Sequence, residues 1–542
     1  MCGIWWEVHP STSFEPQLDE ATRTLISRRG PDRLNGTGEV LCNGRCFVAS
    51  SVLHIRGRNP TPQPITSENG SVLAFNGEIF GGLQIKADDS DSRALSLALS
   101  ECQQPDDVIR CLSELQGPWS LVYFHAPSGK LFIGRDLFGR RSLLWARSQG
   151  ALFVSSVAHE LLDWQLVQSG CVFVISLTAD SIWSSVEIFG IRENIDNQLL
   201  NEFDQVRHCS IEASNWRRIL HVNSDVENRA ASDGDSDSAV VESFIEHLSA
   251  AVAIRVLCVP PSDDRRQCSV AVLFSGGVDS LLLTVLAHRY IPPESPIDLI
   301  NVAFARDDAI EAAATVPDRV TGLTAYEALK KLFPQRRWQF ITVDVPMSEL
   351  QLERRTRISR LVRPSNTVLD DSIGCVIWFA ARAKGVLHET KEQYSSPAKV
   401  LLLGSGADEL LAGYGRHRTR FDHDGPAGLV AELQMELNRI GQRNLGRDDR
   451  IVADHGRESR FPFLDESFVA YVNGLSIYSK VRMDLPRGLG EKWLIRQALR
   501  TFEMPECLCS LPKRAMQFGT RIAKLEQRKE KGGDRCDRLF AD

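Results

Sequence analysis

The sequence lacks the features that direct a protein to a membrane or to a nucleic acid. No apolar run approaches the roughly 20 residues that a membrane-spanning helix needs, and the amino terminus has no signal-peptide pattern. The net charge is only -7 over 542 residues, and no stretch combines basic with stacking aromatic side chains. We therefore expect a cytoplasmic protein that acts on small molecules and has neither a membrane nor a nucleic-acid partner.

Cysteine is present, but not in the patterns that form disulfide frameworks or zinc sites. The 13 cysteines are odd in number and the chain is long. Cys42 and Cys46 form one close pair and Cys507 and Cys509 another, but neither has a second pair at the spacing of a zinc site. The prediction is free thiols in a reducing compartment.

The length predicts two domains, and the segments differ in pattern. Up to about residue 185, short apolar segments separated by turns indicate antiparallel strands, with fewer helices between them. We expect an α+β layered domain over residues 1–185. The predicted strands are 4–8, 47–55, 72–75, 121–124, 131–134 and 152–155, and the clearest helices are 18–26 and 93–99.

A change of composition follows, and we interpret residues 186–237 as a linker. Apolar residues over 241–252 then recur every three or four positions, which predicts an amphipathic helix capped by Ser236 or Asp237. Continuous apolar strands alternating with helices predict a doubly wound parallel sheet, so the second domain has an α/β architecture over residues 238–525. Its predicted strands are 270–274, 297–304, 340–345 and 400–403, and a charged tail covers 526–542.

A glycine loop joins the first of these strands to a helix. Gly276 and Gly277 permit a tight turn whose N–H groups face an anion, and the helix amino terminus adds its positive dipole end. Ser275 and Ser280 add hydroxyl donors, whereas Asp279 would repel bare phosphate and so indicates Mg2+. The loop has neither the lysine of a Walker motif nor the third glycine of a dinucleotide fingerprint. It resembles the pyrophosphate loop of ATP pyrophosphatases, which adenylate a carboxylate or carbonyl oxygen and then admit a nitrogen nucleophile.

A second acidic loop, containing Gly404, Asp408 and Glu409, follows the last predicted strand. Ligands of parallel sheets gather at the carboxyl ends of strands. We therefore predict that Asp279 and Asp408 bind Mg2+ and that Gly404 lies at the ATP site. The alternative is that Asp408 and Glu409 only begin a helix.

The other candidate site begins at Cys2, which becomes the first residue once Met1 is removed. An amino-terminal cysteine combines a thiol nucleophile with an α-amine whose reference pKa is about 7.7–8.0, so the amine can take the thiol proton. Met-Cys alone is weak support for this chemistry. Further motifs follow it in order: Arg29-Gly30-Pro31-Asp32, Gln63-Pro64, Asn76-Gly77-Glu78-Ile79, and Arg135-Asp136 with Phe138-Gly139.

This order and spacing resemble class II glutamine amidotransferases, which have a layered αββα N-terminal-nucleophile fold. The resemblance implies that Cys2 attacks glutamine, that Asn76 and Gly77 stabilise the oxyanion, and that Glu78 and Asp91 hold the ammonium group. The ammonia that is released then serves a synthase domain.

The two halves together resemble glutamine-hydrolysing asparagine synthetase over nearly the whole chain. Arg460 to Asp465 is similar to a segment of that family, and Lys492 occupies the place of its phosphate-binding lysine. Trp119 and the segments 368–374 and 513–519 are most similar to the divergent branch of asparagine synthetase domain-containing proteins. The resemblance implies glutamine, aspartate and ATP as substrates, with Mg2+ as cofactor. A homodimer is left open.

Two positions depart from the family pattern. Val52 stands where the family has an arginine for the glutamine carboxylate, with Arg56 four residues further on. Ser405 replaces a glutamate proposed to accept the proton of attacking ammonia, and a neutral hydroxyl cannot do so near pH 7. Asparagine synthesis is thus one hypothesis; a weakened protein with a binding or regulatory role, or a ligase for another carboxylate, are the others.

Overall fold

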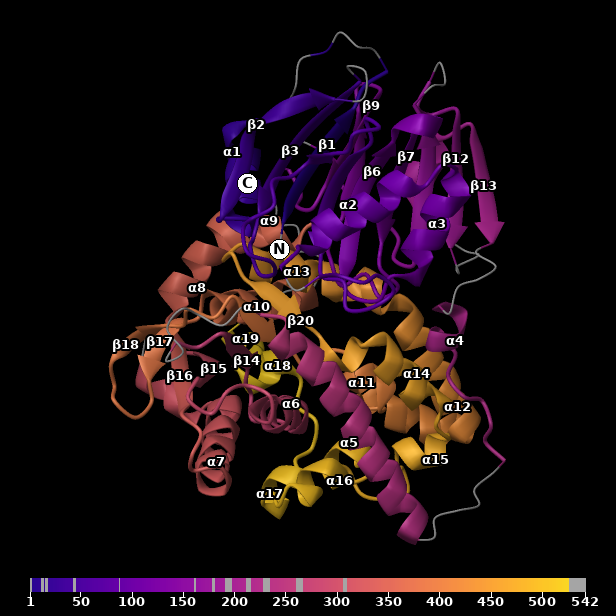
Figure 1. Cartoon of the computed structure of the whole chain (residues 1–542). Coiled ribbons are helices and arrows are strands. Elements are labelled where there is room, and N and C mark those ends of the chain that lie inside the picture. The colour runs from indigo at the N-terminus through magenta and orange to yellow at the C-terminus, as the bar shows by residue number, and fades with distance from the viewer. Residues whose placement is uncertain are drawn as a thin grey trace. The chain divides into compact units, whose positions relative to one another are not determined.

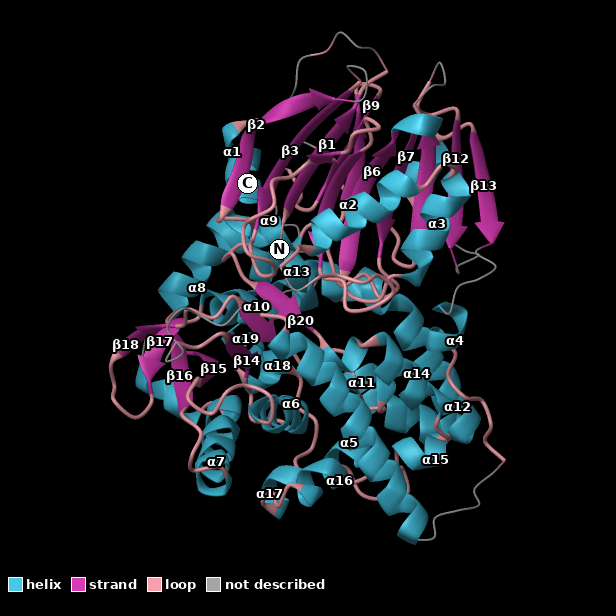
Figure 2. Cartoon of the chain, viewed as in Figure 1, coloured by secondary structure: helices cyan, strands magenta, loops and turns pink. Residues whose placement is uncertain are grey.

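The computed structural model is shown in Figures 1 and 2. It describes residues 2–525 except 11–13, 15–17, 42–44, 87, 160–161, 178–180, 191–196, 211–215, 228–233, 260–266 and 306–309. Met1 and the predicted tail at 526–542 therefore lie outside the described residues. The chain forms two compact units. Unit 1 comprises Met1–Arg217, Ser359–Asn366 and Ile440–Glu458, and unit 2 comprises Arg218–Ile358, Thr367–Arg439 and Ser459–Asp542.

Unit 1 contains two sheets (Figure 2). The first has the order β10 (Gln165–Leu166), β8 (Leu144–Ser148), β9 (Ala151–Ser155), β1 (Gly3–Val8), β3 (Cys46–Val52) and β2 (Arg33–Leu41). The second has the order β13 (Gln205–Ser210), β12 (Ser185–Gly190), β11 (Cys171–Ser176), β7 (Lys130–Arg135), β6 (Trp119–His125), β5 (Val72–Gly77) and β4 (Ile65–Thr66). Pairing is antiparallel except between β12 and β13.

One apolar core joins the two sheets of unit 1. Alternate residues of β1, including Ile4 and Trp6, pack in the same cluster as Val122 of β6 and Ile133 of β7. Helix α1 (Glu20–Arg29) packs on β1 and β3, while α2 (Asp91–Glu101) packs on β5 with α3 (Pro105–Glu114) beside it. Helices on the outer faces explain why these strands are apolar on both sides. The predicted αββα layering is confirmed.

Buried charges join α9 (Ser359–Val362) and α13 (Leu445–Ala453) to this unit, although they are remote in sequence. Asp449 accepts hydrogen bonds from Arg29 Nη2 at 2.8 Å and from the backbone N–H of Ser142 at 3.1 Å. The Nε of Arg450 donates to the carbonyl of Leu361 at 2.8 Å. Buried charges are tolerated when they are paired in this way. The two units therefore do not correspond to two consecutive stretches of the chain, because residues Ser359–Asn366 and Ile440–Glu458 belong to unit 1.

Unit 2 is built on one sheet with the order β18 (Gln393–Ser395), β17 (Lys384–Leu387), β16 (Trp338–Val345), β15 (Ile297–Phe304), β14 (Val270–Leu273), β19 (Val400–Leu402) and β20 (Glu458–Arg460). The pairs β14 with β15, β15 with β16, and β14 with β19 are parallel. The chain runs outward from β14 to β16 and later returns to the other side of β14. The order of strands therefore reverses between β14 and β19, where ligands of doubly wound sheets bind. The predicted α/β architecture is confirmed.

Helices cover the sheet of unit 2 and connect its strands (Figure 1). Helix α6 (Val278–His288) follows β14, and both α7 (Pro317–Leu332) and α10 (Val368–Arg382) pack against β15. Among the described residues, no helix combines the length and the apolar character needed to cross a membrane. Every described cysteine is a free thiol, as expected.

The segment interpreted as a linker has more structure than its composition suggested. It contains β12 and β13, which extend a sheet of unit 1, and α4 (Trp216–Leu220). The capping prediction for the next helix was wrong, because α5 (Gly234–Leu257) begins before Ser236 and Asp237. The Asp237 carboxylate instead accepts a hydrogen bond from Arg482 Nη2 at 2.8 Å. The Asp237 side chain thus forms a tertiary ion pair with Arg482, although the local pattern predicted that it would cap the helix.

Candidate active sites

Cys2 lies immediately before β1, beside the end of β5 in the other sheet. Its backbone N–H donates to Asn76 Oδ1 at 2.8 Å, and Gln63 Nε2 lies 3.3 Å from its Sγ. Burial raises the pKa of the Cys2 thiol, while the Leu53 N–H and Arg29 lower it. The resting thiol is therefore protonated near neutral pH and needs a base. The Asn76 side chain accepts from the nitrogen that would be the α-amine of Cys2 in a chain without Met1.

Asn76 and Gly77, the two residues predicted to stabilise an oxyanion, end β5. Asn76 is fully buried, and its Nδ2 has no hydrogen-bond partner among the described residues. An unsatisfied buried donor costs about 1–3 kcal/mol, so such groups are retained where a ligand satisfies them. A Cβ at Gly77 would lie 2.4 Å from the carbonyl oxygen of Pro118, so only glycine fits against β6 here.

Glu78 and Asp91 are both buried, but Asp91 is already engaged. Asp91 Oδ1 accepts hydrogen bonds from the Ile79 N–H at 2.8 Å and from Arg56 Nη1 at 3.0 Å. Burial raises the pKa of Asp91 and Arg56 opposes that shift. The carboxylate predicted to hold an ammonium group thus already has a cation. Val52, at the end of β3, is a buried apolar side chain.

The second site lies at the reversal of strand order in unit 2. Gly276 has φ +75°, and a Cβ there would lie 2.6 Å from the Gly322 nitrogen, so glycine is required. Gly277 is the N-cap residue of α6, and its N–H donates to Ser275 Oγ at 3.2 Å. Ser280 Oγ donates to the Gly277 carbonyl at 3.2 Å, which holds the turn against the helix. The predicted strand, glycine loop and helix are therefore adjacent as a phosphate site requires.

Asp279, Asp408 and Lys492 meet at this loop. Lys492 Nζ lies 2.6 Å from Asp279 Oδ2 and 2.7 Å from Asp408 Oδ1, and Lys513 Nζ donates to Asp408 Oδ2. Burial alone would raise the pKa of Asp408, but Lys492 and Lys513 hold it well below its ordinary value. Burial likewise disfavours the charged Lys492, yet the two carboxylates raise its pKa. A Cβ at Gly404 would lie 3.1 Å from Asp279 Cβ, so this glycine adjoins the cluster.

These carboxylates fit Mg2+. The Asp279 Oδ1 atom is buried without a hydrogen bond among the described residues, and Asp408 supplies a second hard oxygen ligand. In the part of the chain that the structure describes, no three His, Cys, Asp or Glu side chains form a complete metal cage. Mg2+ commonly binds through one or two carboxylates together with substrate phosphates, as this pair would allow.

Sequence reasoning missed two contributors to this cluster. Lys513 had been noted only as part of a family-like segment, and its contact with Asp408 joins positions 105 residues apart. Gly413 had not been noted, yet a Cβ there would lie 1.9 Å from Asp408 Oδ1. The spacing of Gly413 after the acidic loop is a weak signal, and nothing local indicated Lys513.

Ser405 lies in the loop between β19 and α11 (Ala407–Leu410), partly exposed. The carboxylate of α11, Glu409, is buried and accepts a hydrogen bond from the Tyr414 hydroxyl at 2.6 Å. Burial and the charge of Asp408 raise the pKa of Glu409. Ser405 itself carries no carboxylate that could accept a proton. Of the two acids that follow it, Glu409 accepts a hydrogen bond from Tyr414, and Asp408 pairs with Lys492 and Lys513.

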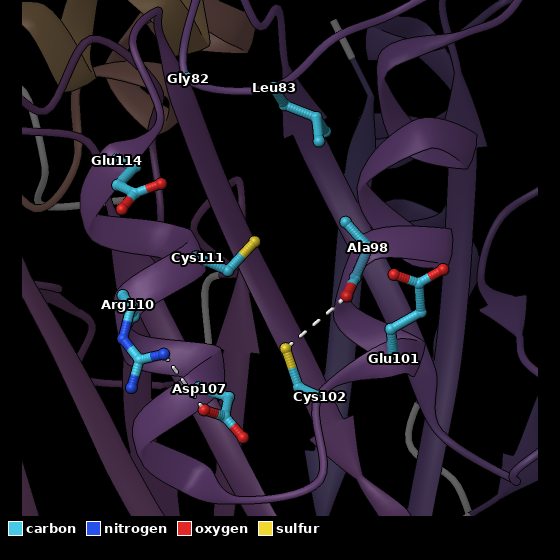
Figure 3. A pocket seen from close by; sticks show the side chains of 9 residues that line it. All are labelled: Gly82, Leu83, Ala98, Glu101, Cys102, Asp107, Arg110, Cys111 and Glu114. Carbon is cyan, nitrogen blue, oxygen red and sulfur yellow. Dashed lines mark hydrogen bonds and ion pairs between the residues drawn. The ribbon is translucent and has the colours of Figure 1, made fainter.

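A separate hollow of about 370 Å3 lies between α2 and α3 (Figure 3). Burial raises the pKa of both thiols that line it, that of Cys111 to about 12, so neither is a ready nucleophile. The lining contains none of the predicted site residues: it consists of Gly82, Leu83, Ala98, Glu101, Cys102, Asp107, Arg110, Cys111 and Glu114. The chemistry is therefore better sought at the two sites above.

Comparison with known proteins agrees with this division. Residues 1–172 match the family described as glutamine amidotransferase domain, and residues 422–532 match asparagine synthase. The chain is 39% identical to "Asparagine synthetase domain-containing protein 1" of Homo sapiens, over 99% of this chain and 98% of that protein. The chain belongs to the asparagine synthetase domain-containing protein family.

Other relatives extend the likeness to synthetases. The Gallus gallus member of the asparagine synthetase domain-containing protein family is 37% identical, over 99% of this chain and 100% of its own length. "Putative asparagine synthetase [glutamine-hydrolyzing] 1" of Methanocaldococcus jannaschii is 23% identical, over 81% of this chain and 71% of that protein. A glutamine-dependent ligase family is thus established.

Proposed function

We propose that this protein is an ATP-dependent, glutamine-hydrolysing asparagine synthetase. The observation that carries the proposal is the meeting of Asp279, Asp408 and Lys492 beside the Ser-Gly-Gly loop, at the reversal of strand order. This arrangement supports an ATP site, and the Cys2–Asn76 pair in the other unit supports a source of nitrogen. Together they account for the nucleotide and the nitrogen donor of an amide ligase, but not for its carboxylic acid substrate.

At the first site, the α-amine of Cys2 takes the thiol proton and Sγ attacks the side-chain amide of glutamine. Asn76 Nδ2, together with the Gly77 backbone, stabilises the oxyanion. One donor in this role lowers the activation free energy by about 2.7–4 kcal/mol. The C–N bond breaks, ammonia leaves with the proton, and a thioester forms on Cys2. Water then hydrolyses the thioester to glutamate.

At the second site, an aspartate carboxylate oxygen attacks the α-phosphorus of ATP and pyrophosphate leaves. Ammonia then attacks the activated carbonyl and AMP leaves, giving asparagine. Asp279 and Asp408 would hold Mg2+, which neutralises phosphate charge when bound. Lys492, already at both carboxylates, and Lys513 supply positive charge to the phosphates.

A second candidate function, a slow or inactive synthetase with a binding or regulatory role, is favoured by Val52 and Ser405. A missing general base typically reduces a rate by 10²–10⁴-fold. A ligase for another carboxylate is a related alternative, because the acid-selecting side chains are not identified by any motif.

The test is to incubate the purified protein with Mg-ATP, either glutamine or ammonia, and a panel of carboxylic acids that includes aspartate. Pyrophosphate release and amide formation are measured for each acid. Asparagine formed from aspartate supports the proposal. Product from another acid assigns a different ligase, and ATP binding without pyrophosphate release from any acid favours the regulatory alternative.

A further inference from the structure

Arg56 is held by its neighbours and still reaches the surface. Its Nη1 donates to Asp91 Oδ1 and to the Ile79 carbonyl, both at 3.0 Å. The Arg56 side chain keeps 21% of its surface exposed, whereas that of Asp91 keeps only 5%. A guanidinium has five N–H donors in one plane, so fixing one corner orients the others. Arg56 therefore presents an oriented, partly accessible cation.

The position of this cation suits the far end of an amide substrate bound at Cys2. Asn76 binds the Cys2 nitrogen, and Ile79, three residues further on, binds Arg56 through its carbonyl. Three residues span at most about 10 Å. Four bonds, or about 5 Å, separate the side-chain amide carbon of glutamine from its α-carboxylate carbon. The distance that residues 76–79 can span is therefore long enough for glutamine to reach from Cys2 to Arg56.

Other arginines near the nucleophile are less suitable. Arg29 is buried, and its Nη2 is bound to Asp449 at 2.8 Å. Arg33 lies opposite Val52 in the β2–β3 pairing, so their side chains share a face of the sheet. It is exposed and forms no ion pair with any described residue, so nothing orients it.

We propose that Arg56 binds the α-carboxylate of glutamine and that Asp91 is the positioning residue that orients it. The inference rests on the glutaminase function proposed for Cys2 and specifies its substrate contact. Glu78 is the other acid that the family resemblance assigns to the α-ammonium group. Arg56 and Glu78 then match the two charges of the zwitterion, and Asp91 beside Arg56 leaves one net negative charge. The arginine expected at position 52 is thus replaced from a position four residues further on.

The first experiment measures glutamate release as a function of glutamine concentration. Arg56→Ala should raise KM about 10- to 100-fold with a smaller change in kcat, because a charge-assisted contact to the substrate is lost. Arg56→Lys should recover part of the loss. Arg58→Ala is the matched control, since Arg58 is exposed and pairs with Asp88 at 2.8 Å; its KM should not change.

A substrate analogue separates binding from folding. Glutaminamide, whose α-carboxylate is an uncharged amide, should be a poor substrate for the wild type and no poorer for Arg56→Ala. Asp91→Asn should raise KM for glutamine, and adding it to Arg56→Ala should cause little further loss. A merely structural Arg56 would instead reduce hydrolysis of both substrates equally.

Glutamine binding to Cys2→Ala, measured by calorimetry, distinguishes the possible failures. Absence of binding overturns both the glutaminase proposal and this inference. Binding that Arg56→Ala leaves unchanged overturns the inference alone. Loss in Arg33→Ala but not in Arg56→Ala assigns the carboxylate to Arg33 and also overturns it.

Discussion

The two candidate sites differ in the kind of buried polar group that has no hydrogen bond among the described residues: a donor at the first and a carboxylate oxygen at the second. At the Cys2 site, the Asn76 Nδ2 donor is buried and has no partner among the described residues. At the candidate ATP site, Asp279, Lys492, Asp408 and Lys513 form a chain of opposite charges. The first site therefore leaves a buried donor without a partner, whereas at the second a cation would have to compete with the lysines for the carboxylates, whose Asp279 Oδ1 atom makes no hydrogen bond with any described residue. We expect the first site to stabilise a transition state and the second to exchange one cation for another.

The largest effect is expected at the nucleophile. Cys2→Ala should abolish glutamine hydrolysis and covalent labelling by a glutamine-like electrophile, because no other group supplies the sulfur. Intact-mass analysis of the wild type should show loss of Met1 and one adduct. Mg-ATP affinity of the variant serves as the control and should be unchanged. Retained Met1 with no adduct at saturating reagent would remove Cys2 from the mechanism.

The unsatisfied donor should come next in size. Asn76→Asp keeps an oxygen that can accept from the Cys2 nitrogen but removes the amide donor. We expect kcat for glutamine hydrolysis to fall about 10²–10³-fold. Asn69→Ala is the control, because Asn69 is exposed and its hydrogen bonds, to the Ser100 carbonyl and from the Ser71 N–H, do not involve Cys2. A loss smaller than tenfold in Asn76→Asp would mean that another group stabilises the oxyanion.

Ser405→Glu tests whether the synthetase site lacks a base. Ammonia becomes positively charged as it attacks the activated carbonyl, and a carboxylate can accept its proton whereas a serine hydroxyl cannot. We expect amide formation from ammonia to rise about 10- to 100-fold, with ATP affinity nearly unchanged. Steady-state rates with aspartate and Mg-ATP measure this, with Ser405→Gln as an uncharged control. Equal gains in both variants would contradict the proton-acceptor argument.

Asp279→Ala tests exchange of charge at the ATP site. Losing a metal ligand should weaken Mg-ATP binding at least about tenfold, or roughly 1.4 kcal/mol. ATP without Mg2+ should bind the variant no worse than the wild type, because Lys492 loses one competing carboxylate. Calorimetry with and without a chelator measures both affinities. The metal assignment fails if the substitution weakens the two equally.

The last prediction concerns stability rather than activity, at a buried lysine in unit 2 that forms no ion pair with a described residue. Lys480, the last residue of α15 (Ile477–Lys480), is buried without an ion pair among the described residues, and burial lowers its pKa from 10.5 to about 7. Between pH 7 and 10 the unfolded chain therefore binds more protons than the folded one. The free energy of unfolding rises with pH over this window, by up to about 1.4 kcal/mol per pH unit from this group.

Lys480→Met should accordingly raise Tm at pH 7, and its advantage over the wild type should shrink towards pH 10. Thermal melts at three pH values measure the difference between the two proteins, so that other titrating groups cancel. Lys384→Met, at an exposed position in β17, is the matched control and should leave Tm nearly unchanged. A Tm difference that does not vary with pH would show that Lys480 is charged in the folded protein.

Much of the fold was predictable because its signals are local. Apolar runs predicted the bounds of β1, β15 and β16 closely, because a buried strand consists of consecutive apolar side chains that are visible in the sequence. The Ser-Gly-Gly loop was equally plain, because φ +75° at Gly276 and the approach of Gly322 demand glycine. Segments of mixed polarity were harder, and the strands β12 and β13 were taken for a linker because their side chains are largely exposed or half-buried and form no continuous apolar run.

The sequence by itself determined the order of elements, the glycine loops and the candidate nucleophile, because each depends on neighbouring residues. Tertiary structure alone decided which distant charges meet. Arg29 pairs with Asp449 across 420 residues, Lys513 with Asp408 across 105, and Arg56 with the Oδ1 atom of Asp91 across 35. Such pairs form because a buried charge must find a partner wherever the fold brings one. Neither the periodicity nor the spacing of residues along the chain predicts which of these charges pair.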